Sequence, residues 1–210
     1  MKNKAVTNEF MENKAVISGI VMKNPTYCFS FLNGNRFYKT VVSCVRKSGI
    51  EDLIPVIIRE QDTEKVIEGK YIRIFGRFYS RNVGKKLILE VWAKKVESLQ
   101  ARLDDDINKI LLEGYICKEP VYRKTPLNRK ILDLMLAVNR PSKKSDYIPC
   151  IAWEANAWIL NGMHVGDKIF IKGRIQSRDY LKKISKEECE TRTAYEVSIF
   201  DYELQDTGGK

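Results

Sequence analysis

The sequence predicts an all-β chain with short helices, organised as two similar barrels in tandem. Three observations support this prediction. Short runs of residues alternate between apolar and polar with the two-residue period of β-strands. Turn residues separate these runs, and the whole pattern occurs twice, about 95 residues apart.

The repeat is visible in three segments that recur in the same order at nearly one offset. The matched segments are NKAVISG at 13–19 with NKILLEG at 108–114, LIPVIIRE at 53–60 with YIPCIAWE at 147–154, and IRIFGR at 72–77 with FIKGR at 170–174. We therefore predict an N-terminal domain at 10–98, an acidic linker at 99–106 and a C-terminal domain at 107–204. The linker carries three consecutive aspartates and is expected to be solvated.

Each repeat contains five expected strands and one helical stretch. In the second repeat we expect strands at 107–117, 130–140, 146–153, 167–178 and 193–203, with a helix at 154–162. In the first repeat we expect strands at 13–23, 36–46, 53–59, 70–81 and 85–97, with a weak helix at 61–68. Five strands with a helix between the third and fourth are typical of the OB-fold, a five-stranded Greek-key barrel. Gly114 and Gly173 lie where such a barrel needs tight bends or close approaches.

Composition narrows the class of function. The chain has a net charge of +10 and a sequence pI of about 9.3, which favours anionic partners, nucleic acid first and an acidic membrane surface second. No apolar run reaches the roughly 18 residues of a membrane span, and the N-terminus lacks the apolar core of a signal peptide, so we expect a cytoplasmic protein. Five scattered cysteines, one histidine and no glycine-rich phosphate loop favour a non-enzymatic protein without metal or cofactor.

The strand at 145–153 is the first candidate for a binding surface. Period-two alternation puts Tyr147 and Trp153 on one face, and Ile148, Cys150 and Ala152 on the other. Aromatic rings beside the loop cations Lys143 and Lys144 suit the bases and phosphates of a single-stranded nucleic acid. The alternative is that both rings belong to an ordinary core.

The expected fourth strand of the second repeat also carries charge on one face. That face contains Lys172, Arg174, Arg178 and Tyr180, opposite an isoleucine-rich face. Loop cations at Arg123, Arg129 and Arg140 would extend a basic rim that follows a phosphate backbone. A merely solvated face is the alternative.

Residues 108–200 resemble a bacterial single-stranded DNA-binding protein of the SSB family. The resemblance rests on NKILLxG at 108–114, LAVNR at 136–140, DYIPCIAW at 146–153, KGRIQSR at 172–178 and YEV at 195–197. It implies an OB-fold that binds single-stranded DNA without sequence preference. Tyr147, Trp153 and Tyr180 fall at positions where the family stacks bases. Pro141 and Ser142 stand where the family tends to have a further aromatic.

The first repeat departs from this pattern, because Leu53, Arg59 and Val83 occupy the aligned ring positions. Its fourth strand nevertheless alternates cations and rings on one face. These tentative DNA-binding residues are Arg73, Phe75, Arg77, Tyr79 and Arg81. They would either bind DNA with a shifted set of rings or pack a subunit interface; interleaved charge favours binding.

The resemblance implies further expectations about assembly and process. Most members of the family are tetramers with one OB-fold per chain, so two folds per chain predict a homodimer with four. DNA replication, recombination or repair near the nucleoid is the expected setting. Replication or repair proteins are possible partners, but the printed chain ends without the family's acidic, Phe-terminated tip, so their recruitment would need another route. The alternatives are an OB-fold adaptor of the primosomal protein N type and a protein that binds single-stranded RNA. Trp92 and Trp158 are expected to pack in the core.

Overall fold

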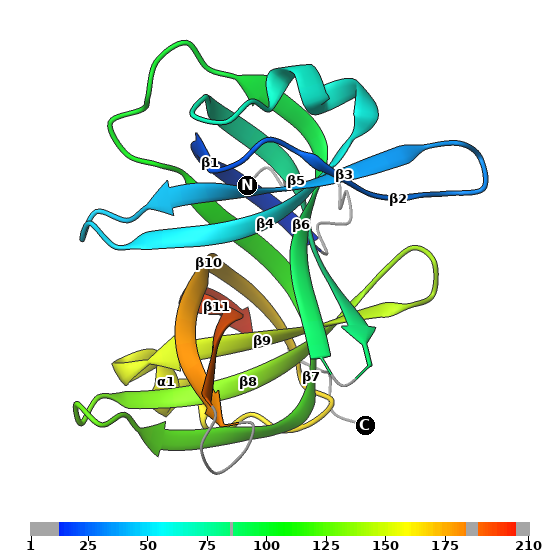
Figure 1. The fold of residues 1–210 in the computed structure, drawn as a ribbon. Helices are drawn as coiled ribbons and strands as arrows, with labels where there is room; N and C mark the ends of the chain where they lie inside the picture. The colour runs from blue at the N-terminus through cyan, green and yellow to red at the C-terminus, as the bar shows by residue number, and fades with distance from the viewer. Residues whose placement is uncertain (1–12, 85, 184–188, 205–210) are drawn as a thin grey trace, which may run out of the picture.

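The computed structural model describes residues 13–84, 86–183 and 189–204. Residues 10–12 of the expected N-terminal domain lie outside these residues. The chain end at 206–210, on which the expectation about an acidic tip rests, also lies outside them. Figure 1 shows two barrels, one formed by the first half of the chain and the other by the second.

The first barrel contains six strands and a short 3-10 helix. The elements are β1 (Asn13–Val21), β2 (Thr26–Ser30), β3 (Arg36–Val45), β4 (Glu51–Arg59), η1 (Glu60–Lys65), β5 (Tyr71–Val83) and β6 (Lys86–Ser98). The sequence did not predict β2, and the helix expected at 61–68 is the 3-10 helix η1 instead. β2 pairs with β3 and forms a hairpin that projects from the barrel (Figure 1).

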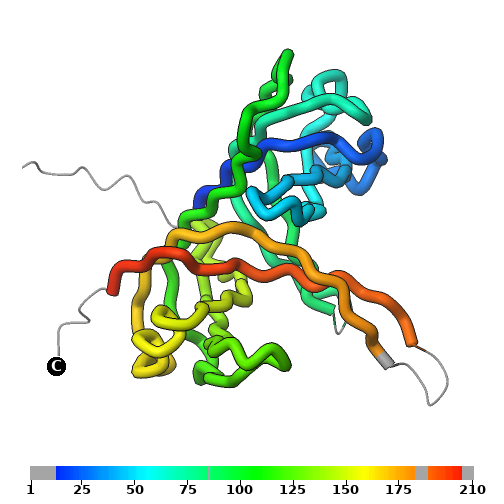
Figure 2. Tube along the Cα trace, turned by 90° about the vertical axis from the view of Figure 1, so that its left-hand side faces the viewer, coloured from blue at the N-terminus to red at the C-terminus, as the bar shows by residue number. Residues whose placement is uncertain are grey.

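The second barrel repeats this plan. Its elements are β7 (Asn108–Lys124), β8 (Lys130–Asn139), β9 (Ser145–Trp153), α1 (Glu154–Leu160), β10 (Lys168–Lys183) and β11 (Cys189–Leu204). The single long strand β7 occupies the positions of both β1 and β2, because its C-terminal part pairs with β8 as β2 pairs with β3. β10 and β11 form a long hairpin that extends past the barrel (Figure 2).

Both barrels close in the same way. β1 pairs with β3 and β5, β3 with β4, and β5 with β6, while one short parallel pairing between β4 and β6 completes the ring. In the second barrel β9 and β11 form the equivalent parallel pair. The architecture is therefore all-β, with two tandem OB-folds, as the sequence predicts.

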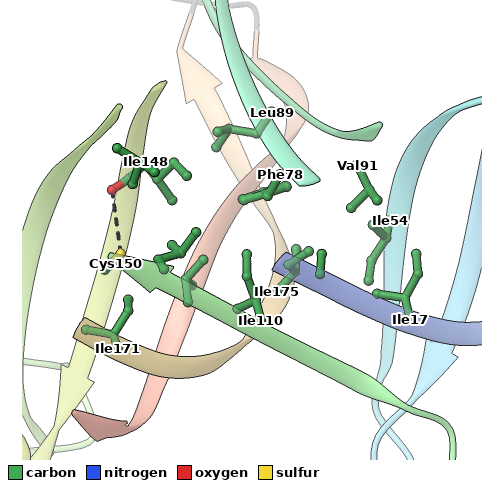
Figure 3. Close-up of a cluster of buried hydrophobic side chains, with 14 of the residues drawn as sticks. Ile17, Ile54, Phe78, Leu89, Val91, Ile110, Ile148, Cys150, Ile171 and Ile175 are labelled. Atoms are coloured by element: carbon green, nitrogen blue, oxygen red, sulfur yellow. Dashed lines mark hydrogen bonds between the residues drawn. The ribbon is translucent and has the colours of Figure 1, made fainter. Parts of the chain in front are cut away.

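Alternation along the strands builds the core as expected. Ile148, Cys150 and Ala152 on β9 are buried, and so are Ile169, Ile171 and Ile175 on β10. Figure 3 shows buried side chains running from Ile17 and Ile54 of the first barrel to Ile148 and Cys150 of the second.

Gly114 and Gly173 make the close approaches that the sequence predicts. A Cβ atom on Gly114 would lie 2.7 Å from the Ala137 carbonyl oxygen, and one on Gly173 would lie 2.6 Å from that of Ser198. Contacts this short with backbone atoms exclude any side chain at both positions.

The two barrels join through an antiparallel pairing of β1 with β7. Ala15 faces Ile110 at the centre, Asn13 faces Leu112, and Ile17 faces Asn108. Since the repeat makes Asn13 equivalent to Asn108 and Ile17 equivalent to Leu112, this register is symmetric about its centre. The chain thus contains an internal two-fold relation of the kind that identical subunits show in a dimer.

Two matching asparagines bind the strand beside them. The Asn13 side chain donates to the Phe78 carbonyl at 2.7 Å and accepts the Phe78 N–H at 2.9 Å. The Asn108 side chain makes the same two bonds to Ile175, at 2.6 and 2.9 Å. Each asparagine satisfies a backbone donor and acceptor that lack partners at that point of the sheet.

Two buried aspartates link the barrels in a reciprocal manner. Asp52 of the first repeat accepts the Ser177 N–H at 2.9 Å, and Asp146 of the second accepts the Ser80 N–H at 2.5 Å. In return, Ser177 Oγ accepts the Leu53 N–H and Ser80 Oγ accepts the Tyr147 N–H. We call these contacts, with Arg46 and Arg140 that pair with the aspartates, the two clamps.

The acidic linker is not solvated throughout, which corrects the sequence-based expectation. Asp104 and Asp105 are exposed, but the Asp106 side chain is 1% exposed. It accepts the Val45 N–H at 2.7 Å and the Tyr71 hydroxyl at 2.6 Å. The linker is therefore fixed to the first barrel at its end.

Candidate nucleic-acid interface

A groove around Trp153 brings together several of the predicted site residues. It encloses about 370 Å³ between the two barrels, and we call it the Trp153 groove. Its lining residues are Arg46, Ile50, Arg129, Trp153, Arg174, Gln176, Ser177 and Arg178. Two of them, Arg46 and Ile50, come from the first repeat, so the groove lies where the two barrels meet.

Trp153 ends strand β9 and is partly exposed. Its indole N–H donates to Ser198 Oγ on β11 at 3.2 Å, which fixes the plane of the ring. The guanidinium carbon of Arg129 lies 4.4 Å from the ring centroid, so a cation already covers part of one face. A base would stack on the remaining exposed surface or displace the Arg129 side chain.

Arg174 is an arginine without a protein partner at one of its donors. Among the described residues, its Nε atom is buried and has no hydrogen-bond partner. Burial, followed by the nearby Arg46, lowers the pKa of the Arg174 guanidinium. An anion in the groove would offset the repulsion between the Arg174 and Arg46 guanidinium groups.

Arg178 lies further along β10, where its side chain is 57% exposed. Its contact with Glu196 is 3.7 Å long, so that pairing leaves most of the guanidinium free to meet another anion.

The two other predicted rings lie outside this groove. Tyr147 is 47% exposed on β9 and Tyr180 is 40% exposed on β10. Tyr180 lines a separate hollow with Pro149, Arg192 and Tyr195. The backbone of Tyr147 is held by Ser80 of the first repeat, so the second clamp also positions this ring.

Four other predicted cations form two groups, one exposed and one already paired with carboxylates. Lys143 and Lys144 are exposed in the β8–β9 turn, where they are accessible to phosphate. Lys172 contacts Asp201 at 2.9 Å and Glu203 at 3.2 Å, and Arg123 donates twice to Asp133. Both are already paired.

Arg140 belongs to a clamp, which does not support its predicted phosphate contact. It pairs with Asp146, whose side chain is 1% exposed, and donates to the Ser80 carbonyl at 2.7 Å. The bond to Asp146 raises the pKa of the Arg140 guanidinium. Its guanidinium carbon also lies 4.4 Å from the centroid of the Tyr79 ring.

The tentative residues of the first repeat also divide. Arg77, Tyr79 and Arg81 line a second groove of about 410 Å³, which we call the Trp92 groove. Arg73 lies 3.7 Å from Glu97, and the Phe75 ring lies 5.7 Å from the Lys95 ammonium; neither lines this groove.

The expectation that Trp92 and Trp158 pack in the core is not met. Trp158 is 71% exposed on α1, where Ala157 and Leu160 are the buried residues. Trp92 is partly exposed and lines a groove. The spacing of Ala157 and Leu160, three residues apart, indicated which face of the helix is buried.

The family model of the "Single-strand binding protein family" matches residues 107–204. The second repeat is therefore similar to the single-strand binding protein family. The expected resemblance is thereby confirmed for the second repeat.

Curated relatives match about a third of the chain. A stretch of 85 residues is 38% identical to "Single-stranded DNA-binding protein 3" of Streptococcus agalactiae, which covers 35% of this chain and 59% of that protein. A stretch of 81 residues is 33% identical to "Single-stranded DNA-binding protein 3" of Listeria innocua, which covers 35% and 51%. The chain thus spans about half the length of these relatives.

A solved structure covers both repeats. The crystal structure of the wild-type single-stranded DNA binding protein from Thermus aquaticus superposes with a TM-score of 0.74 at 19% identity, over 94% of this chain and 95% of that one. At this identity the match supports the fold, including the tandem arrangement of two OB-folds.

Two further observations concern metal sites and membrane-spanning helices. Within the described ranges, no three His, Cys, Asp or Glu side chains group so as to hold a metal ion. Neither helical segment of the described chain has the length and apolar character needed to cross a bilayer.

Proposed function

We propose that this protein binds single-stranded DNA without sequence preference, by stacking bases on exposed rings and by contacting phosphates with lysine and arginine. The observation that carries the proposal is the Trp153 groove. It presents a partly exposed indole among four arginines, and three of these arginines and the indole lie in the repeat that matches the single-strand binding family. A ring and several cations in one groove suit a flexible, anionic strand whose every base has a stacking face.

The groove and its surroundings suggest a role for most of the residues predicted in the second repeat. Trp153, Tyr147 and Tyr180 would stack bases, while Arg174 and Arg178 would contact phosphates beside them. Lys143 and Lys144 would add exposed charge near the strand. Lys172 and Arg123 would need to exchange their carboxylate partners for phosphate, so we assign them smaller contributions.

The biological setting follows from the proposed activity. A protein of this kind protects and extends unpaired DNA during replication, recombination or repair, in the cytoplasm at the nucleoid, and needs no catalytic group. We further propose a homodimer that presents four OB-folds. Light scattering coupled to size-exclusion chromatography tests the dimer: a mass near 24.4 kDa at all concentrations would contradict it.

The central experiment measures binding of the full chain to dT oligomers at several salt concentrations. Affinity should fall log-linearly with salt, because each phosphate contact releases counterions. An adaptor that acts mainly through protein contacts would show no such dependence. Parallel titrations with rU oligomers decide between DNA and RNA, and tighter binding of rU would contradict the proposal.

A matched pair of double variants tests the residues. Tyr147→Ala with Trp153→Ala removes two rings and should weaken dT binding by about 1–3 kcal/mol for each base that loses its stack. Leu53→Ala with Arg59→Ala changes the equivalent positions of the first repeat and should have a much smaller effect. Equal losses in the two variants would mean that the wrong repeat has been assigned.

A further inference from the structure

The first repeat lacks an aromatic residue at the position of Trp153, but it has a tryptophan, Trp92, on the neighbouring strand of the barrel wall. The parallel pairing that closes each barrel establishes the equivalence. Ile57 pairs with Trp92 in the first barrel, and Ile151 pairs with Ser198 in the second. Because the repeat makes Ile57 equivalent to Ile151, Trp92 stands where the second repeat has Ser198.

Ser198 is the residue over which the Trp153 ring lies. The indole N–H of Trp153 donates to Ser198 Oγ at 3.2 Å, so the ring reaches across from β9 to β11. In the first repeat Arg59 replaces Trp153, and Trp92 projects from β6 instead. The ring is therefore retained at this site and comes from the neighbouring strand.

The Trp92 ring lies at the edge of an aromatic cluster. The ring centroids of Tyr79, Phe29 and Phe37 lie 5.4, 5.6 and 5.6 Å from that of Trp92. Phe31, at the end of β2, is 50% exposed and lines the Trp92 groove together with Trp92 and Tyr79. The groove thus offers partly exposed rings held in place by their neighbours.

Cations surround these rings as they surround Trp153. Arg77 is equivalent to Arg174, and within the described chain its Nε atom is likewise buried without a hydrogen-bond partner. Arg81 is equivalent to Arg178, and its side chain is 47% exposed.

One carboxylate also lines the Trp92 groove, and its charge is already compensated. The side chain of Glu90 is 2% exposed. It contacts Lys39 at 2.6 Å and Arg81 at 3.3 Å, so it does not oppose an anion. The groove therefore has rings and positive charge together, which suits a nucleic-acid strand better than an apolar protein segment.

We propose that the Trp92 groove is a second base-stacking site for single-stranded DNA, with Trp92 in place of Trp153 and Arg77 in place of Arg174. This inference rests on the proposed function of the chain. Phe31 also lines the adjoining hollow, of about 690 Å³, together with Arg36 and Arg59.

Variants with a single tryptophan separate this inference from the proposed function. Trp153→Phe with Trp158→Phe leaves Trp92 as the only tryptophan, and Trp92→Phe with Trp158→Phe leaves Trp153. Addition of dT oligomers should quench the fluorescence of both variants. Quenching of Trp153 alone would overturn the inference and leave the proposed function intact. If neither is quenched and neither variant binds dT, the proposed function fails as well.

Affinity measurements provide an independent test. Phe31→Ala should weaken dT binding by between about 5-fold and about 150-fold, the range for loss of one stacked base. Phe31 is half-exposed, so this variant should fold, and its thermal unfolding is compared with that of the parent. Trp158→Ala, which removes an exposed ring that lines neither groove, is the matched control and should bind as the parent does.

The alternative occupant of the groove is a second copy of this chain. If Phe31→Ala converts a dimer to a monomer in light scattering and leaves dT affinity unchanged, the groove is a subunit interface and the inference is overturned. Weaker dT binding with an unchanged mass supports it.

Discussion

The two repeats have the same backbone fold but carry their exposed aromatic rings on different strands. Both close through the same short parallel pair, both use an asparagine to bind the adjacent strand, and both supply one aspartate to a clamp. In the second repeat the tryptophan comes from β9, whereas in the first it comes from β6. The comparison teaches that the backbone constrains where a ring can lie, but leaves open which strand supplies it.

The clamps should give the largest effects. Asp146→Ala leaves Arg140 without its buried partner, and Asp52→Ala does the same to Arg46. We expect each variant to lower the free energy of unfolding by about 3 kcal/mol, because a largely buried charge loses its counterion. Urea denaturation of the two variants measures this directly.

Asp133→Ala is the control for the clamps. Its pair with Arg123 is exposed, with side-chain exposures of 44% for the arginine and 37% for the aspartate, and should contribute about 1 kcal/mol or less. A loss at Asp146 no larger than that at Asp133 would show that the barrels do not depend on the clamps.

The matching asparagines should give intermediate and nearly equal effects. Asn13→Ala and Asn108→Ala each remove two hydrogen bonds and leave a backbone N–H and C=O without partners. We expect a loss of about 1–3 kcal/mol in the free energy of unfolding for each. Asn82→Ala, at an exposed position of β5, should change it by less than about 0.5 kcal/mol. Strongly unequal losses of unfolding free energy at Asn13 and Asn108 would show that the two asparagine contacts are not equivalent.

Arg174 and Arg77, whose buried Nε atoms have no hydrogen-bond partner among the described residues, should give the smallest effects, and these concern binding. Arg174→Gln and Arg77→Gln each remove one phosphate contact, so the slope of log affinity against log salt should become shallower by about 0.7 for a single strand. Lys65→Gln, on η1 and outside both grooves, should leave the slope unchanged. A change at Arg174 but not at Arg77 would limit binding to the second repeat.

Much of the fold could be predicted because it depends on local patterns. Alternation in IPCIA at 148–152 identifies the buried face of β9, and the repeated segments identify two barrels. The clamps could not be predicted, because Asp52 and Ser177 lie 125 residues apart and neither residue type indicates a partner at that distance. β2 was missed because its residues alternate poorly between buried and exposed positions.

The site was predicted in part for the same reason. The positions of Tyr147 and Trp153 on an outward face follow from period two, and the structure has both partly exposed. Arg140 resembles its loop neighbours Lys143 and Lys144 in sequence, but the aspartate six residues later pairs with it. Trp92 could be compared with Ser198 only after the pairing of β6 and β11 with their neighbours was known.

The pairing of β1 with β7 within one chain has a consequence for how amino-acid substitutions can alter this molecule. In an assembly of identical subunits, every substitution occurs on both sides of the two-fold axis, so both binding surfaces are altered together. Here the two sides are encoded separately, and a substitution at Trp92 leaves Trp153 untouched. The junction is also intramolecular, so dilution does not separate the two barrels. Each half is thus able to change its proposed stacking site while the site of the other half stays as it is.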